Sequence, residues 1–220
     1  MDSTIEVLNL VELGGIPTVS CEMSDGNLAV GNQEGIVNII SPEGMVKESF
    51  ELEGKIIGLF EIGDNLIVGS SISGICGFSK EIIWSHELNS GCEIICLSGP
   101  DFLVADSSGA LFRFDSDGDL LWEKKLGQMT HICSNDEGNY SAIALENGDF
   151  IMVNNSGDEI RTSQAASDDI ETISSVIFRS SDVLVVSRNS LGMAIDDRPE
   201  NRIECWSIQK GQIHSCEVDS

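Results

Sequence analysis

Three aspartates at alternating positions, Asp115, Asp117 and Asp119, form the sharpest cluster of possible metal ligands in the sequence. Carboxylates at positions i, i+2 and i+4 of a turn can converge on Ca²⁺, as they do in calcium-binding loops. Leu120, however, stands where such a loop requires glycine, and the segment 154–157 (Asn-Asn-Ser-Gly) reads as the same turn without the aspartates. The cluster is a calcium candidate, but an ordinary Asx/Gly hairpin turn is the favoured interpretation.

A second group of charged residues lies in an irregular segment from Met193 to Asn201. A segment that interrupts one unit of a repetitive chain often forms a binding loop. We therefore expect it to project from one face of the fold, where it is a candidate loop for binding a protein partner; a surface loop without a function is the slightly favoured interpretation. The residues expected to make the contact are Asp196, Asp197, Arg198, Glu200 and the adjacent Arg202.

Glutamates recur in four apolar segments that are expected to be strands: Glu22, Glu61, Glu93 and Glu171. Carboxylates that face a common channel could hydrolyse a glycosidic bond by acid–base chemistry. With only twelve aromatic residues in the chain, such a channel would offer few rings for sugar stacking. An enzyme of the glycosidase or lyase type is the alternative reading, and we expect that the protein is not an enzyme.

The sequence contains no other motif that carries chemistry. It has neither a glycine-rich phosphate-binding loop nor a paired-histidine motif, and its three histidines fall in separate segments. No cofactor is therefore expected, and no metal apart from the calcium candidate.

The elements that must position these residues follow from a repeat of about forty residues. Each unit contains an apolar strand, a second apolar strand, a glycine turn, a third strand, an Asx/Gly turn and a fourth strand. The separations of the turn glycines are 39, 35, 39 and 44 residues, a spacing typical of four-stranded propeller blades. The glycines are Gly35, Gly74, Gly109, Gly148 and Gly192.

These repeats predict an all-β fold, a β-propeller of about five four-stranded blades in a single domain, residues 1–220. Period-two alternation marks the third strands, and the second strands are more continuously apolar, as expected for strands buried on both faces. The repeats run over residues 16–54, 55–91, 92–128, 129–169 and 170–220.

The ends of the chain leave the closure of the ring open. Residues 1–15 contain an apolar stretch that would form an extra N-terminal strand, and the fifth repeat carries a fourth strand of its own. The ring is therefore closed with five blades, or contains an incomplete sixth blade, or is completed in trans by another chain. Because open sheet edges favour aggregation, some form of closure is expected.

Charge restricts the class of partner. The chain carries 37 acidic and 12 basic residues, a formal net charge of -25. Such a surface repels phosphate backbones and anionic lipids, so neither nucleic acid nor membrane is expected as a partner. The acidity is either an adaptation for solubility at high salt, which we favour, or a means of attracting a basic protein.

Seven cysteines, an odd number, follow an N-terminus without the features of a secretory signal. We expect reduced, buried thiols and a cytoplasmic protein. The chain also has no apolar run long enough to cross a membrane.

Two repeats resemble known propeller families. Residues 105–126 (ADSSGALFRFDSDGDLLWEKKL) resemble the quinoprotein-type, PQQ-like repeat, and residues 201–218 (NRIECWSIQKGQIHSCEV) look like the third and fourth strands of a WD40 blade. Both resemblances imply a propeller. The chain departs from the first family because Trp84 and Trp122 alone occupy the equivalent fourth-strand position, and its five short repeats do not match the larger ring that holds the quinone cofactor.

The favoured function is a non-catalytic scaffold that mediates protein–protein interaction in a larger assembly. The alternatives are the channel-acid enzyme and one portion of a split propeller. A homo-oligomer, or a ring completed in trans, agrees with the scaffold and with the split propeller.

Overall fold

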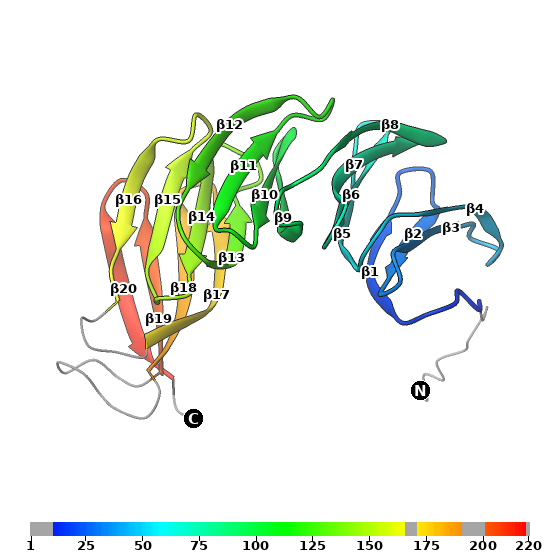
Figure 1. Cartoon of the computed structure of the whole chain (residues 1–220). Helices are drawn as coiled ribbons and strands as arrows, with labels where there is room; N and C mark the ends of the chain where they lie inside the picture. The colour runs from blue at the N-terminus through cyan, green and yellow to red at the C-terminus, as the bar shows by residue number, and fades with distance from the viewer. Residues whose placement is uncertain (1–10, 166–170, 191–200, 219–220) are drawn as a thin grey trace, which may run out of the picture. The chain divides into compact units, whose positions relative to one another are not determined.

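The computed structural model describes residues 11–165, 171–190 and 201–218, and every regular element in these ranges is a β-strand (Figure 1). Twenty strands form five antiparallel sheets of four strands each, and the strands of each sheet follow one another along the chain. The predicted all-β architecture of five four-stranded repeats is confirmed. In these ranges there is no helix that could cross a membrane.

The sheets belong to two compact units, residues 1–93 and 94–220, of which the first holds sheets 1 and 2. Sheet 1 consists of β1 (Pro17–Glu22), β2 (Leu28–Asn32), β3 (Ile36–Ile40) and β4 (Val46–Glu51). Sheet 2 consists of β5 (Ile56–Ile62), β6 (Asn65–Ser70), β7 (Gly74–Ser79) and β8 (Glu81–His86).

The second unit holds sheets 3 to 5, except that β9 begins two residues before the boundary. Sheet 3 consists of β9 (Cys92–Ser98), β10 (Asp101–Asp106), β11 (Ala110–Phe114) and β12 (Leu120–Lys125). Sheet 4 consists of β13 (Met129–Ser134), β14 (Tyr140–Leu145), β15 (Phe150–Asn154) and β16 (Glu159–Ser163). Sheet 5 consists of β17 (Glu171–Ser180), β18 (Val183–Ser190), β19 (Asn201–Ser207) and β20 (Gly211–Glu217).

The extra strand expected over residues 1–15 is not seen in the part that the structure describes, since residues 11–15 are not in a strand. Gly14 and Gly15 have φ angles of 63° and 72°, which interrupt an extended backbone. Residues 1–10 lie outside the described residues, and the assignment of the whole chain to one domain stays a prediction.

The second strands of sheets 1 to 4 are buried on both faces, as their continuous apolar sequences predict. In β6, β10 and β14 every residue after the first is buried, and in β2 only Leu28 is exposed. Neighbouring sheets supply the cover: Ala29 of sheet 1 packs in one core with Val68 of sheet 2, and Leu103 of sheet 3 packs with Ile143 of sheet 4.

The third strand of sheet 3 has no solvent-facing polar side, although its sequence alternates. Arg113 in β11 is only 2% exposed, and its guanidinium pairs with the carboxylate of Asp101 at 2.8 Å. Its Nη2 also donates to the carbonyl oxygen of Gly138 in sheet 4 at 3.1 Å. The polar position of this strand is therefore used for contact between sheets.

Glycine is required in the turn between the second and third strands. At Gly35 a Cβ atom would lie 1.9 Å from the carbonyl oxygen of Leu52, so no side chain fits. Gly192 lies outside the described residues. The φ angles lie between 82° and 89° at the four described anchors, Gly35, Gly74, Gly109 and Gly148.

The turn between the third and fourth strands contains one residue in the left-handed region in every sheet. Four sheets place a glycine there, with φ between 80° and 85°: Gly44, Gly118, Gly157 and Gly211. Sheet 2 has Lys80 instead, with φ of 67°. Because a Cβ atom clashes with the backbone in this conformation, the lysine is strained where glycine would not be.

Replacing Lys80 by glycine should therefore stabilise the protein. Relief of roughly 1–2 kcal/mol of left-handed strain outweighs the added freedom of glycine in the unfolded chain, which leaves a gain of about 0.5–1 kcal/mol. The free energy of unfolding in urea measures it. Ser79→Gly, one residue earlier and not in the left-handed region, is the control and should destabilise. A loss of stability in Lys80→Gly would contradict the interpretation.

Candidate functional site

The aspartate cluster forms the turn between β11 and β12 and does not gather around a metal position. The carboxylate of Asp115 accepts hydrogen bonds from the backbone N–H groups of Asp117 and Asp119 at 3.0 and 2.9 Å. Asn154 caps the corresponding turn of sheet 4 in the same way. Within the described residues, no three His, Cys, Asp or Glu side chains are arranged to hold a metal ion. The geometry therefore supports the Asx/Gly turn.

The insertion expected to bind a partner joins β18 to β19. Asp196, Asp197, Arg198 and Glu200 lie outside the described residues, so their role stays a prediction. Arg202 lies in β19, is only 4% exposed, and is engaged by two carboxylates. Its guanidinium is thus held inside the molecule instead of being presented on a projecting loop.

Arg202 belongs to a buried ionic network that the sequence reasoning did not identify. Arg188 Nε lies 3.1 Å from Glu204 Oε2, and Arg202 Nε lies 2.7 Å from Glu204 Oε1. Both guanidinium groups also pair with Glu171. Two positive and two negative side chains, each no more than 5% exposed, thus balance one another.

The network fastens sheet 5 to sheet 4. Arg188 donates from Nη1 to the carbonyl oxygen of Gly148 at 2.5 Å and from Nη2 to Ser163 Oγ at 3.1 Å. The same guanidinium lies 5.7 Å from the ring centre of Phe150, a cation–π distance. Trp206 Nε1 donates to Glu204 Oε2 at 2.9 Å. The contacts of Arg188 join the two sheets, and the hydrogen bond from Trp206 fixes Glu204, which pairs with Arg188.

The network holds Glu204 in its charged form. Burial alone would raise the pKa of Glu204, but the nearby charges of Arg188 and Arg202 and the hydrogen bond from Trp206 outweigh it, so the pKa lies below its usual value. The hydrogen bonds and charges of Glu171 and Glu204 likewise outweigh the burial of Arg202 and raise its pKa.

The four recurring glutamates do not share one environment. Glu171 is committed to the ionic network, whereas Glu22 and Glu93 are exposed. Glu61 accepts hydrogen bonds from the backbone N–H of Ser24 at 2.6 Å and from its hydroxyl at 3.1 Å. Two of the four carboxylates are therefore held by separate local contacts, and the other two are exposed to solvent.

The expectation of buried thiols is correct only in part, since four of the seven cysteines are half-buried and Cys216 is exposed. Burial raises the pKa of Cys76, Cys92 and Cys133 to about 12 in each case. Cys133 also packs against the core between sheets 4 and 5. These thiols stay protonated at neutral pH and act as small apolar side chains.

On the fourth strands of sheets 3 and 4, the residue four positions after the turn glycine contacts the next sheet. Trp122 Nε1 donates to the carbonyl oxygen of Asn155 at 2.9 Å, and its ring lies where a Cβ on Gly157 would come within 3.0 Å. Arg161, at the same position of sheet 4, donates from Nη2 to the carbonyl oxygen of Ile208 at 2.9 Å. An arginine therefore makes the contact that tryptophan makes one sheet earlier.

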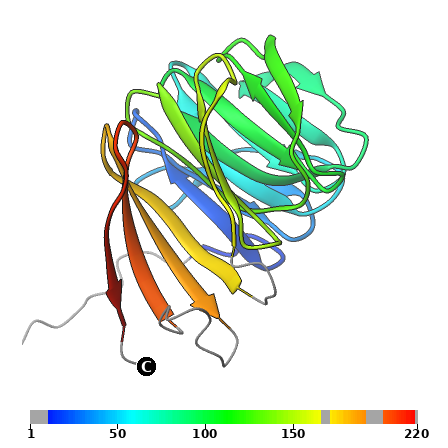
Figure 2. The same cartoon turned by 90° about the vertical axis from the view of Figure 1, so that its left-hand side faces the viewer.

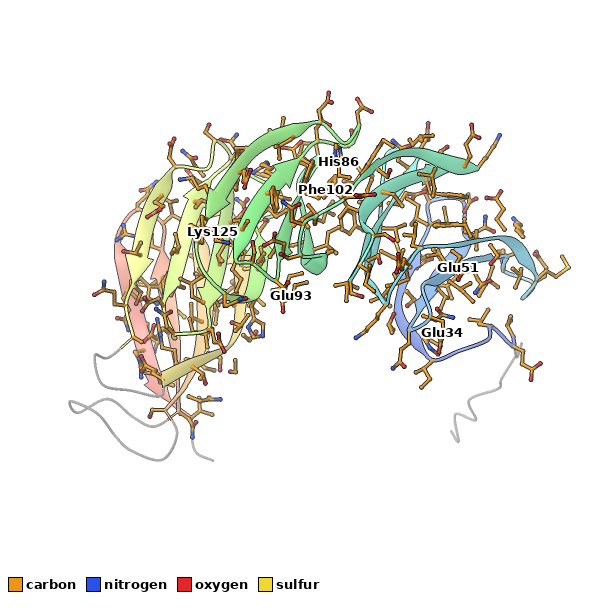
Figure 3. The ribbon with its side chains drawn as sticks, in the orientation of Figure 1. Glu34, Glu51, His86, Glu93, Phe102 and Lys125 are labelled. Atoms are coloured by element: carbon orange, nitrogen blue, oxygen red, sulfur yellow. The ribbon has the colours of Figure 1, made fainter. Side chains whose placement is uncertain are left out.

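An exposed apolar residue recurs on the fourth strands, two positions after the left-handed turn residue. These four residues are 43–50% exposed, and only sheet 4 has a charged residue, Glu159, at the same place. Two of these strands end in a charged residue, β4 in Glu51 and β12 in Lys125 (Figure 3). The recurring residues, here called the fourth-strand apolar positions, are Val46, Ile82, Leu120 and Ile213.

Comparison with known proteins identifies the fold. No protein-family model matches the chain, and no curated protein matches its sequence. The crystal structure of the WD40 β-propeller domain of Doa1 matches 96% of this chain and 71% of its own, with a TM-score of 0.66 and 13% identity. The fold is a β-propeller.

A second match is the crystal structure of the computationally designed Ika8 protein, with a TM-score of 0.74 and 13% identity. The match covers 96% of this chain and 65% of that chain. Chains of solved structures that match number 1186, so the fold is shared too widely to assign an activity.

Neutralising Glu204 should destabilise the protein strongly, because Glu204→Gln leaves two buried arginines with one carboxylate. We expect a loss of about 3–5 kcal/mol at pH 7 in urea unfolding. Since the folded-state pKa lies below the unfolded value, the charge contributes above the unfolded pKa and its contribution disappears as the pH falls through the folded pKa. The difference between wild type and variant should therefore shrink below about pH 4.

The exposed Glu123→Gln is the matched control, and it should change stability by no more than about 0.5 kcal/mol at any pH. A Glu204→Gln variant as stable as wild type at pH 7 would show that the network is not needed to join sheets 4 and 5.

Proposed function

We propose that the chain is a non-catalytic propeller scaffold that binds other proteins within a larger assembly. The observation that carries the proposal is the repetition of an exposed apolar residue at one structural position in four sheets: Val46, Ile82, Leu120 and Ile213. Single exposed apolar residues are normal on protein surfaces. Their repetition at one position, on a chain with 37 acidic residues, calls for a partner that covers them.

The partner's chemistry follows from the surface around these positions. Apolar side chains supply affinity once they are removed from water, and charge supplies steering and specificity. Among the described residues three basic side chains (Arg113, Arg188, Arg202) and three acidic ones (Asp106, Glu171, Glu204) are buried, so burial leaves the strongly negative net charge on the surface. A basic protein segment with apolar side chains fits this surface.

A channel-acid enzyme is the alternative and has less support. Its strongest candidate, Glu171, is neutralised by Arg202 and Arg188, which leaves no free carboxylate for acid–base work at that position. Glu22 and Glu93 lack the burial that would adapt a carboxylate to catalysis.

We also propose that the repeats of this chain are related to the quinoprotein-type, PQQ-like repeat. It is supported by Trp122, whose ring packs on the turn glycine of the next sheet and whose N–H binds that turn. The free cysteines agree with a reducing compartment such as the cytoplasm.

Affinity capture with matched surface variants tests the scaffold. The tagged chain is expressed in its own cells as wild type, as the triple variant Val46→Ser, Ile82→Ser, Leu120→Ser, and as a control triple variant, Ile16→Ser, Ile72→Ser, Leu97→Ser. The control residues are 46–60% exposed and lie outside the fourth-strand apolar positions. We expect wild type and the control to capture the same partner protein in similar amounts. The amount captured by the first triple variant should be at least about tenfold lower, since a loss of about 1.4 kcal/mol lowers affinity tenfold.

Capture should also weaken at high salt, because screening removes the attraction between an acidic surface and a basic partner. Equal capture by all three proteins would overturn the fourth-strand apolar positions as the binding surface.

A further inference from the structure

A groove of about 570 Å³ lies in the first unit, where residues 52–55, which join sheet 1 to sheet 2, meet the turn between β6 and β7. The strands of this unit are the blue to teal ones in Figure 2. The volume falls within the range of small-molecule sites, roughly 300–1,000 Å³. The residues that give the groove its chemistry are Leu52, Glu53, Ile72, Ile82, Ser85 and Glu87.

One wall of the groove is the linker, which hydrogen bonds fix to the turn. The backbone N–H of Glu53 donates to Ser73 Oγ at 2.9 Å, and its carbonyl oxygen accepts a hydrogen bond from the Ser70 hydroxyl at 2.5 Å. A Cβ atom on Gly54 would lie 2.8 Å from Ile72 Cγ1, so glycine permits the close approach of this isoleucine. The backbone that carries Glu53 and Ile72 is therefore in place before a ligand binds, which lowers the entropic cost of binding.

The opposite wall is the face of β8 that is turned toward sheet 1. Ile82 pairs with Phe78, and Ser85 pairs with Cys76, across β8 and β7. Phe78 and Cys76 belong to the core between sheets 1 and 2, and directly paired residues share a face. Ile82 and Ser85 therefore line the groove on the side where the two sheets of this unit meet.

The groove combines apolar surface with negative charge. Ile72 is 55% exposed and Ile82 is 43% exposed, so both offer apolar surface that water reaches. Glu53 and Glu87 are exposed, and within the described residues neither carboxylate accepts a hydrogen bond or forms an ion pair. None of the described residues that line the groove is basic. Its charge therefore complements a cation, and its apolar residues complement a hydrocarbon chain.

We propose that this groove binds an organic ammonium ion that carries an apolar chain. The ammonium group donates charge-assisted hydrogen bonds to the carboxylates of Glu53 and Glu87, and these are stronger than hydrogen bonds between neutral groups. The chain lies on Ile72 and Ile82, where the removal of its methylene groups from water supplies further affinity. A neutral alcohol lacks the first contact, and a short amine lacks the second.

An NMR titration of the isotope-labelled full chain with n-hexylammonium tests the proposal. We expect saturable chemical-shift changes at the amides of residues 52–55, 71–73 and 82–89. n-Hexanol has the same chain without the charge, and methylammonium has the same charge without the chain. Each should therefore bind at least about tenfold more weakly. Shift changes spread evenly over the acidic surface would show non-specific attraction of a cation and would overturn the proposal.

Charge-matched variants separate the groove from the general acidity of the chain. The double variant Glu53→Gln, Glu87→Gln should weaken the binding of n-hexylammonium at least about tenfold. The control Glu123→Gln, Glu159→Gln removes the same charge from exposed positions outside the groove and should bind the ligand like wild type. Equal affinities of the two double variants would contradict a role of the groove carboxylates.

A further pair of variants tests the apolar half of the site and separates it from the proposed function, on which it does not depend. Ile72→Ser should weaken the binding of n-hexylammonium and leave that of methylammonium unchanged, whereas Leu120→Ser should change neither. Capture of a protein partner should show the opposite dependence, because Leu120, and not Ile72, is one of the fourth-strand apolar positions. An Ile72→Ser variant that binds n-hexylammonium as tightly as wild type would exclude the apolar contact.

Discussion

Apolar side chains on both faces of a strand need cover on both faces, and this requirement organises the whole chain. The second strands of sheets 1 to 4 carry such side chains, and the cores lie between consecutive sheets within each unit. No single four-stranded sheet of this composition would be stable in water, because its inner strands would expose continuous apolar surface. Within each unit, a sheet is thus covered by the sheet that follows or precedes it in sequence.

Polar contacts then fix how consecutive sheets meet. Arg113 reaches the carbonyl oxygen of Gly138, Trp122 that of Asn155, and Arg188 that of Gly148. All are long side chains with N–H donors that satisfy a backbone carbonyl of the neighbouring sheet. The residue type and its strand differ from one contact to the next. In sheet 4, where the fourth strand lacks the tryptophan, Arg161 makes the contact to the carbonyl oxygen of Ile208. Sheet 5 adds the ionic network, whose four buried charges compensate one another.

Strands, turns and the number of sheets could be predicted because they depend on local signals: the alternation of apolar residues, their continuity in second strands, and glycine where φ must be positive. The ionic network could not. Arg202, Glu204 and Trp206 occupy alternate positions of β19, a pattern that fits a solvent-exposed face as well as a buried one. Only the ion pairs with Arg188 and Glu171, on other strands, show that the face is buried. The Asp115 cluster shows the opposite difficulty, since its spacing fits both a metal loop and a capped turn.

The cover that sheets 4 and 5 give each other depends on the ionic network around Arg188, Arg202, Glu171 and Glu204. Hydrogen exchange of the backbone amides in Glu204→Gln and in wild type tests this most directly. The account predicts that exchange in β14 and β18 is faster in the variant, while exchange in β6, in the other unit, does not change. Equal exchange in the two proteins would contradict it, since sheets 4 and 5 would then be held together without the network.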